Sequence, residues 1–181
     1  MDKSLKSYAI KLSKETLYVL MAIVGAVVLP QIFHCVGIWT GVGGKLGQIF
    51  LPMYIPVLIL GFYKGSLSGV VAGLLSPLVS FLLTAMPTQS LLPDITIELV
   101  ATGFLAGAFS KIKMPAVLRV LSVQVLAKII RVVALFISLY LMSGVVSASV
   151  LFAGIAVSIP GVVLQLILVT LLIVKKGKQG E

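Results

Sequence analysis

The chain has 181 residues, of which 60% are hydrophobic and only 10% are charged, and its mean hydropathy is +1.21. A soluble domain of this length cannot bury so much apolar surface, so the composition excludes a soluble globular protein and indicates lipid as the solvent. In such a chain the formal charge of +9 bears on membrane topology, not on nucleic-acid binding.

Apolar stretches recur along the chain at lengths near the roughly 20 residues that a membrane-spanning helix needs. We predict an all-α integral membrane protein, a single domain of six transmembrane helices over residues 16–33, 48–62, 66–86, 94–110, 115–142 and 145–174. The first helix is expected to be retained, because no small-x-small cleavage site of a signal peptide follows it. The second is short and contains Pro52 and Pro56, so it is predicted to be bent or partly re-entrant.

Basic residues near the ends of these helices set the expected orientation. Lysines precede the first helix and follow the last, and Lys64 and Lys111 lie in turns on the same side of the membrane. Lys45 is expected on the opposite side, together with Asp94 and Glu98. Six spans with both termini in the cytoplasm satisfy this distribution.

A polar face on the fifth predicted helix is the first candidate for a ligand site. Gln124, Lys128 and Arg131 follow the spacing i, i+4, i+7 and share one helix face near the middle of an apolar run. A charge near the bilayer centre costs at least ~2.5–3.5 kcal/mol, so these cations are expected to face a protein interior or an aqueous cavity. We predict that at least one binds a ligand; the alternative is an ion pair with Asp94 or Glu98.

The acidic residues of the fourth predicted helix admit two roles. Asp94 follows Pro93 and is expected to cap the helix. Glu98 lies one turn deeper and either pairs with a cation of the fifth helix or accepts a donor group of a substrate. Trp39 is explained as an interfacial anchor, although it could also stack on a ring of a ligand.

Small residues at regular spacing form a second pattern. Ala22 and Ala26 are spaced for close helix approach, either inside the bundle or against a partner membrane protein, and Gly65, Gly69 and Gly73 predict a close-packing seam.

The sequence contains no HExxH, GxSxG or GK[ST] motif. We therefore expect no metal, no cofactor, no enzyme activity and no ATP hydrolysis by this chain.

Four stretches are distinctive: LPMYIPVLILG at 51–61, GSLSGVVAG at 65–73, LSPLVSFLLTAMP at 75–87 and ELVATGFLAG at 98–107. They resemble the substrate-binding membrane subunit, or S component, of energy-coupling factor (ECF) vitamin transporters. The resemblance implies a bacterial cell-membrane protein that captures a vitamin or precursor outside the cell. A transmembrane coupling subunit and two ATPase subunits would power its release inside.

The resemblance also assigns roles to residues. The spacing Ala22-x-x-x-Ala26 fits the alanine motif that docks on the coupling subunit. The substrate site would lie in the outer half of the bundle, where Gln124, Lys128, Arg131 and Glu98 map. Ser158 and Gln165 of the sixth helix would line it, with a break at Pro160 between them that frees backbone groups.

The two cations beside an amide favour an anionic ligand, such as pantothenate, niacin or a phosphorylated precursor. The alternative function is a self-sufficient secondary transporter or channel for a small organic solute, with Asp94 and Glu98 as candidates for a coupling-ion site. An intramembrane enzyme ranks last, because the single histidine, His34, has no evident nucleophile or metal partner.

Overall fold

The computed structural model describes residues 3–41, 43, 45–143 and 148–179, and every regular element in these ranges is an α-helix. The helices are α1 (Lys3–Trp39), α2 (Lys45–Phe50), α3 (Tyr54–Lys64), α4 (Ser66–Thr84), α5 (Leu92–Phe109), α6 (Ala116–Ser143) and α7 (Ala148–Gln179). Within the described residues, five helices have a stretch long and apolar enough to cross a membrane, whereas α3, with 11 residues, does not. The predicted all-α membrane fold is therefore confirmed.

The predicted second helix, 48–62, is divided into α2 and α3, and the chain breaks where the two prolines predicted a bend. Pro52 and Pro56 have no N–H to donate to the carbonyls four residues earlier, so an unbroken helix would lose two hydrogen bonds. The backbone instead turns at Leu51, which adopts a left-handed conformation with φ of 46°. The Tyr54 N–H then donates to the Leu51 carbonyl at 3.1 Å as α3 begins.

Two other boundaries also differ from the prediction. α1 covers 37 residues instead of the predicted 16–33, and at 1.5 Å per residue it is about 55 Å long, well beyond the ~30 Å of a hydrocarbon core. α7 runs through Pro160 without the predicted break. The predicted start of that helix, residue 145, lies outside the described residues, and α7 begins at Ala148.

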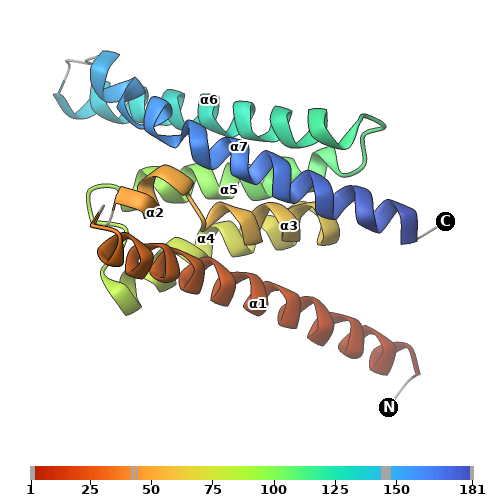
Figure 1. The fold of residues 1–181 in the computed structure, drawn as a ribbon. Helices are drawn as coiled ribbons and strands as arrows, with labels where there is room; N and C mark the ends of the chain where they lie inside the picture. Colours follow the sequence, from red (N-terminus) through yellow and green to blue (C-terminus); the bar gives the residue numbers. More distant parts are fainter. Residues whose placement is uncertain (1–2, 42, 44, 144–147, 180–181) are drawn as a thin grey trace.

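The helices run side by side along one direction, with α2 and α3 together making one passage through the bundle (Figure 1). The first turn of α1 and the last turn of α7 lie at the same end, as do the α3–α4 and α5–α6 turns. Two contacts fix this end: the Tyr63 hydroxyl donates to the Leu172 carbonyl at 2.8 Å, and the Lys64 ammonium lies 3.6 Å from the Tyr18 ring centroid. This arrangement agrees with an even number of passages; which end faces the cytoplasm remains a prediction.

Glycines bring α4 and α5 into backbone contact. A Cβ at Gly73 would lie 2.5 Å from the Leu99 carbonyl oxygen, and Gly69 and Gly103 would each collide with the other's backbone. The predicted close-packing seam is confirmed at Gly69 and Gly73. Gly65 has a different role, because it makes the α3–α4 turn with φ of 97° and a Cβ there would meet open space.

The α1 alanines lie inside the bundle. Ala22 is 9% exposed, Ala26 is fully buried, and both pack in a core cluster with Tyr54, Val57 and Ala72. The close helix approach that their spacing predicts is therefore used within the chain. The two side chains pack against α3 and α4 in this state, and the docking role on a coupling subunit stays a prediction.

Candidate functional site

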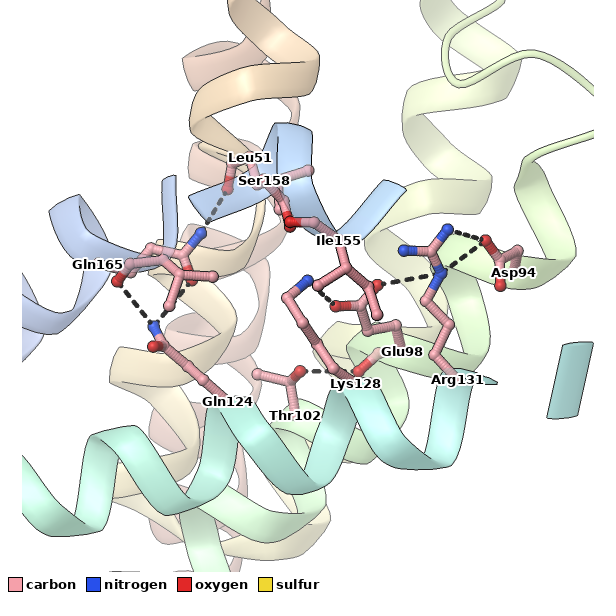
Figure 2. Close-up of polar contacts among 11 residues, drawn as sticks. Leu51, Asp94, Glu98, Thr102, Gln124, Lys128, Arg131, Ile155, Ser158 and Gln165 are labelled. Carbon is pink, nitrogen blue, oxygen red and sulfur yellow. Dashed lines mark hydrogen bonds and ion pairs between the residues drawn. The ribbon is translucent and has the colours of Figure 1, made fainter. Parts of the chain in front are cut away.

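Four charged side chains meet between α5 and α6 (Figure 2). The Lys128 ammonium donates to Glu98 Oε1 at 2.9 Å, and both Nε and one terminal nitrogen of Arg131 lie 2.7 Å from Asp94 Oδ2. Arg131 Nε also lies 3.6 Å from Glu98 Oε2, which links the two pairs. We call these four residues the charge cluster. The side chain of Glu98 is 4% exposed and that of Lys128 is 15% exposed, so the central pair is largely removed from solvent.

Helical spacing accounts for the charge cluster. Asp94 and Glu98 are one turn apart on α5, and Lys128 and Arg131 are three residues apart on α6, so each helix presents two charges on one face. The glycine seam holds the opposite side of α5 against α4. The two acidic residues are thereby directed to α6, with which α5 is also packed. The ion-pair alternative from the sequence is the arrangement that forms.

Two buried glutamines extend the cluster to α7 and to the break between α2 and α3. Gln124 Nε2 donates to Gln165 Oε1 at 3.2 Å, and Gln165 Nε2 donates to the Leu51 carbonyl at 3.2 Å. A Cβ at Gly161 would lie 2.6 Å from the Ile49 carbonyl oxygen, so this glycine lets the end of α2 rest directly on α7. The left-handed turn at Leu51 is thus held against α7 by both a close approach and a hydrogen bond.

A small cavity lies where the charges and the amides meet. Its volume is about 10 Å³, measured as the space over which the centre of a water molecule can move, and this is room for about one water. The lining residues are Leu51, Tyr54, Glu98, Thr102, Gln124, Lys128, Val162 and Gln165. Gln124 is 5% exposed, and its Oε1 atom is buried without a hydrogen-bond partner in the described part of the chain. A residue that lines the cavity therefore carries a buried acceptor without a partner.

Four of the seven predicted substrate-binding residues line this cavity: Gln124, Lys128, Glu98 and Gln165. Arg131 does not line it, but its Nε lies 3.6 Å from Glu98 Oε2. Ser158 is buried nearby on α7, but its hydroxyl donates to the Ile155 carbonyl at 2.9 Å and does not line the cavity (Figure 2).

Trp39 is not brought to the site. It ends α1 and is 94% exposed, as an interfacial anchor would be, so the stacking alternative has no support here.

Four residues that line the cavity were not among the predicted site residues: Leu51, Tyr54, Thr102 and Val162. Thr102 lies one turn after Glu98 and donates from its hydroxyl to the Glu98 carbonyl at 2.7 Å, so the spacing i, i+4 was an available signal. Tyr54 is the first residue of α3 and is 4% exposed, next to the Glu98 carboxylate. Its place follows from the break at Leu51, which the sequence does not reveal.

The charge cluster is electrically balanced, with two cations and two carboxylates. The two unpaired cations that favoured an anionic ligand are therefore neutralised in this state. Among the described residues, no group of three or more His, Cys, Asp or Glu side chains could hold a metal ion. The cavity is lined by one ion pair, the hydroxyls of Tyr54 and Thr102 and the amides of Gln124 and Gln165.

Comparisons with protein-family models, with curated proteins and with solved structures found no match to this chain. The function must therefore be argued from the site and from the fold.

Proposed function

We propose that this chain is the substrate-binding membrane subunit of an ECF-type uptake transporter in the bacterial plasma membrane. It would bind a small polar solute, a vitamin or a precursor, at the cavity between α3, α5, α6 and α7. The observation that carries the proposal is the buried charge cluster beside a residue with an unpaired amide oxygen, inside a bundle of mostly apolar helices.

Stability is a poor explanation for such a cluster. Desolvation of two charges offsets much of their attraction, and apolar residues of similar size often stabilise a protein as well or better. Ionisable residues at membrane depth are therefore functional candidates by default. Lys128, near the middle of α6, and Glu98, near the start of α5, carry that cost here.

The cluster lies toward one face of the membrane. Asp94 and Glu98 lie in the first turns of α5, at the opposite end of the bundle from the chain termini (Figure 1). If the termini are cytoplasmic, as the basic residues predict, the cluster lies in the outer half of the membrane. A solute would then reach it from outside, as a capture subunit requires.

Energy would come from partners. The sequence has no Walker-type phosphate loop, which agrees with ATP hydrolysis on two separate ATPase subunits joined through a transmembrane coupling subunit. Because Ala22 and Ala26 pack against α3 and α4, the coupling subunit would also contact other, lipid-facing side chains.

Ligand binding by the purified protein tests the proposal. The protein is purified in mild detergent, copurifying small molecules are identified by mass spectrometry, and the affinity of each is measured by calorimetry. We expect one polar solute to bind with at least tenfold weaker affinity to Lys128→Ala, whereas Lys111→Ala, in the exposed α5–α6 turn, serves as the matched control and binds normally. Equal affinity in the parent and in Lys128→Ala would contradict the site.

A second candidate function rests on the break at Leu51. Discontinuous helices beside a polar site at membrane depth are typical of secondary transporters. Reconstitution of this chain alone in liposomes separates the two candidates. Gradient-driven uptake without ATPase subunits would favour the secondary transporter, and binding without uptake would favour the capture subunit.

A further inference from the structure

Only one of the two ion pairs borders the cavity. Lys128 and Glu98 are among the lining residues. Arg131 and Asp94 lie on the side away from Gln124 and Gln165 and are bound to each other at 2.7 Å (Figure 2). Because this space holds about one water, a larger ligand would have to part the surrounding side chains to enter it. Such a ligand would meet one cation and one anion, and these two groups already satisfy each other at 2.9 Å.

We propose that the ligand is a zwitterion, a small molecule with one carboxylate and one protonated amine, that inserts into the Lys128–Glu98 ion pair. Its carboxylate would accept from Lys128 and its ammonium would donate to Glu98. The inference rests on the proposed function and names the substrate class of that site, in place of the anionic class that the sequence favoured.

Charge balance is the first argument. The charge cluster has no net charge, and binding of a zwitterion does not change that. Lys128 would pair with the ligand carboxylate and Glu98 with the ligand ammonium. A simple anion would bind Lys128 but leave Glu98 with the neutral Tyr54 hydroxyl beside it and a 3.6 Å contact to Arg131, and it would add a net negative charge inside an apolar bundle. Uncompensated charge in such surroundings is strongly unfavourable.

The unpaired amide oxygen is the second, independent argument. The Leu51 carbonyl can only accept, so Gln165 must direct its NH₂ group to it and its oxygen to Gln124. Gln124 must then offer its own NH₂ group to Gln165, which leaves Gln124 Oε1 as the buried atom without a partner in the described residues. An unpaired acceptor on a residue that lines the cavity suits a ligand N–H donor better than a carboxylate.

A matched set of probes tests the inference with the full-length protein in nanodiscs. The probes are β-alanine as the zwitterion, propanoate as the anion and propylammonium as the cation, and the readout is thermal stabilisation against probe concentration. We expect β-alanine to bind the parent at least tenfold more tightly than either singly charged probe.

Substitution of one partner should change the preference. Glu98→Gln leaves the site with one extra positive charge, so we expect propanoate to bind this variant at least tenfold more tightly than it binds the parent. The affinity of β-alanine for this variant should fall at least tenfold. Lys128→Met should shift the preference to propylammonium in the same way. Lys111→Met, outside the site, should leave all three affinities unchanged.

The charge-reversed double variant Glu98→Lys/Lys128→Glu keeps one cation and one anion at the cavity, so it tests the inference where a single variant does not fold. We expect it to retain the preference for β-alanine. Tighter binding of propanoate than of β-alanine to the parent would overturn the zwitterion and leave the capture function standing. If no probe binds and no small molecule copurifies with the parent, the proposed function itself fails.

Discussion

Removal of the Glu98 charge is the most direct test of how the charge cluster holds α5 against α6. Glu98→Gln keeps the size of the side chain but leaves Lys128 without the carboxylate that lies 2.9 Å from its ammonium. Breaking a buried ion pair by removal of one partner costs about 3–5 kcal/mol. Because the Lys128 side chain is 15% exposed, we expect the lower end, about 3 kcal/mol of unfolding free energy.

The contacts within the charge cluster predict how the loss of unfolding free energy differs between variants. Asp94→Asn should cost less, about 1.5 kcal/mol, because Arg131 keeps its contact with Glu98 Oε2 at 3.6 Å. The double variant Glu98→Gln/Lys128→Met removes both charges of the central pair, so it should recover most of the stability that Glu98→Gln loses.

Unfolding of the protein in lipid–detergent micelles by titrated SDS, followed by circular dichroism, gives these free energies. Lys111→Met is the control; its side chain is exposed in a turn, and we expect a change within about 0.5 kcal/mol. The reasoning is refuted if Glu98→Gln costs less than about 1 kcal/mol, or if the double variant is as unstable as the sum of its two single variants.

Three further substitutions probe how the bundle builds the site. Gly103→Ala should lower the free energy of unfolding by about 1–3 kcal/mol in the same assay, because its Cβ meets the backbone of Gly69. Gly47→Ala is the control, because a Cβ there meets open space and should not destabilise the protein. Gly161→Ala should push the end of α2 away from α7 and raise amide hydrogen exchange at residues 49–54, and unchanged exchange would contradict the close approach at Ile49. Tyr63→Phe should cost about 1 kcal/mol through the lost 2.8 Å bond to the Leu172 carbonyl, a loss that the SDS titration would detect.

Periodicity in the sequence was enough to predict which charged and amide side chains share a face. The spacing of Gln124, Lys128 and Arg131 places them on one stripe of α6 in any helix, and the same holds for Asp94 and Glu98 on α5. Whether the two stripes face each other depends on how each helix is rotated about its axis in the bundle. That rotation is a tertiary property, so the sequence left ligand contact and ion pairing both open.

The α1 alanines show the same limit. A spacing of four residues permits close helix approach but does not say which helix approaches, and Ala22 and Ala26 are used within the chain. The break at Leu51 had a partial signal in Pro52 and Pro56, which predicted a bend. Nothing in a leucine indicates a positive φ, so the exact turn, and with it the placement of Tyr54, could not be predicted.

Two locally unfavourable features converge on one small cavity, and their coincidence argues for selection on binding. A non-glycine residue in the left-handed region costs about 1–2 kcal/mol, and Leu51 adopts that conformation where its carbonyl accepts from Gln165. The Lys128–Glu98 pair adds the cost of desolvated charge at the same cavity. Since neither feature is needed to make an apolar helical bundle, a ligand that uses both the ion pair and the amides gives one explanation for their position.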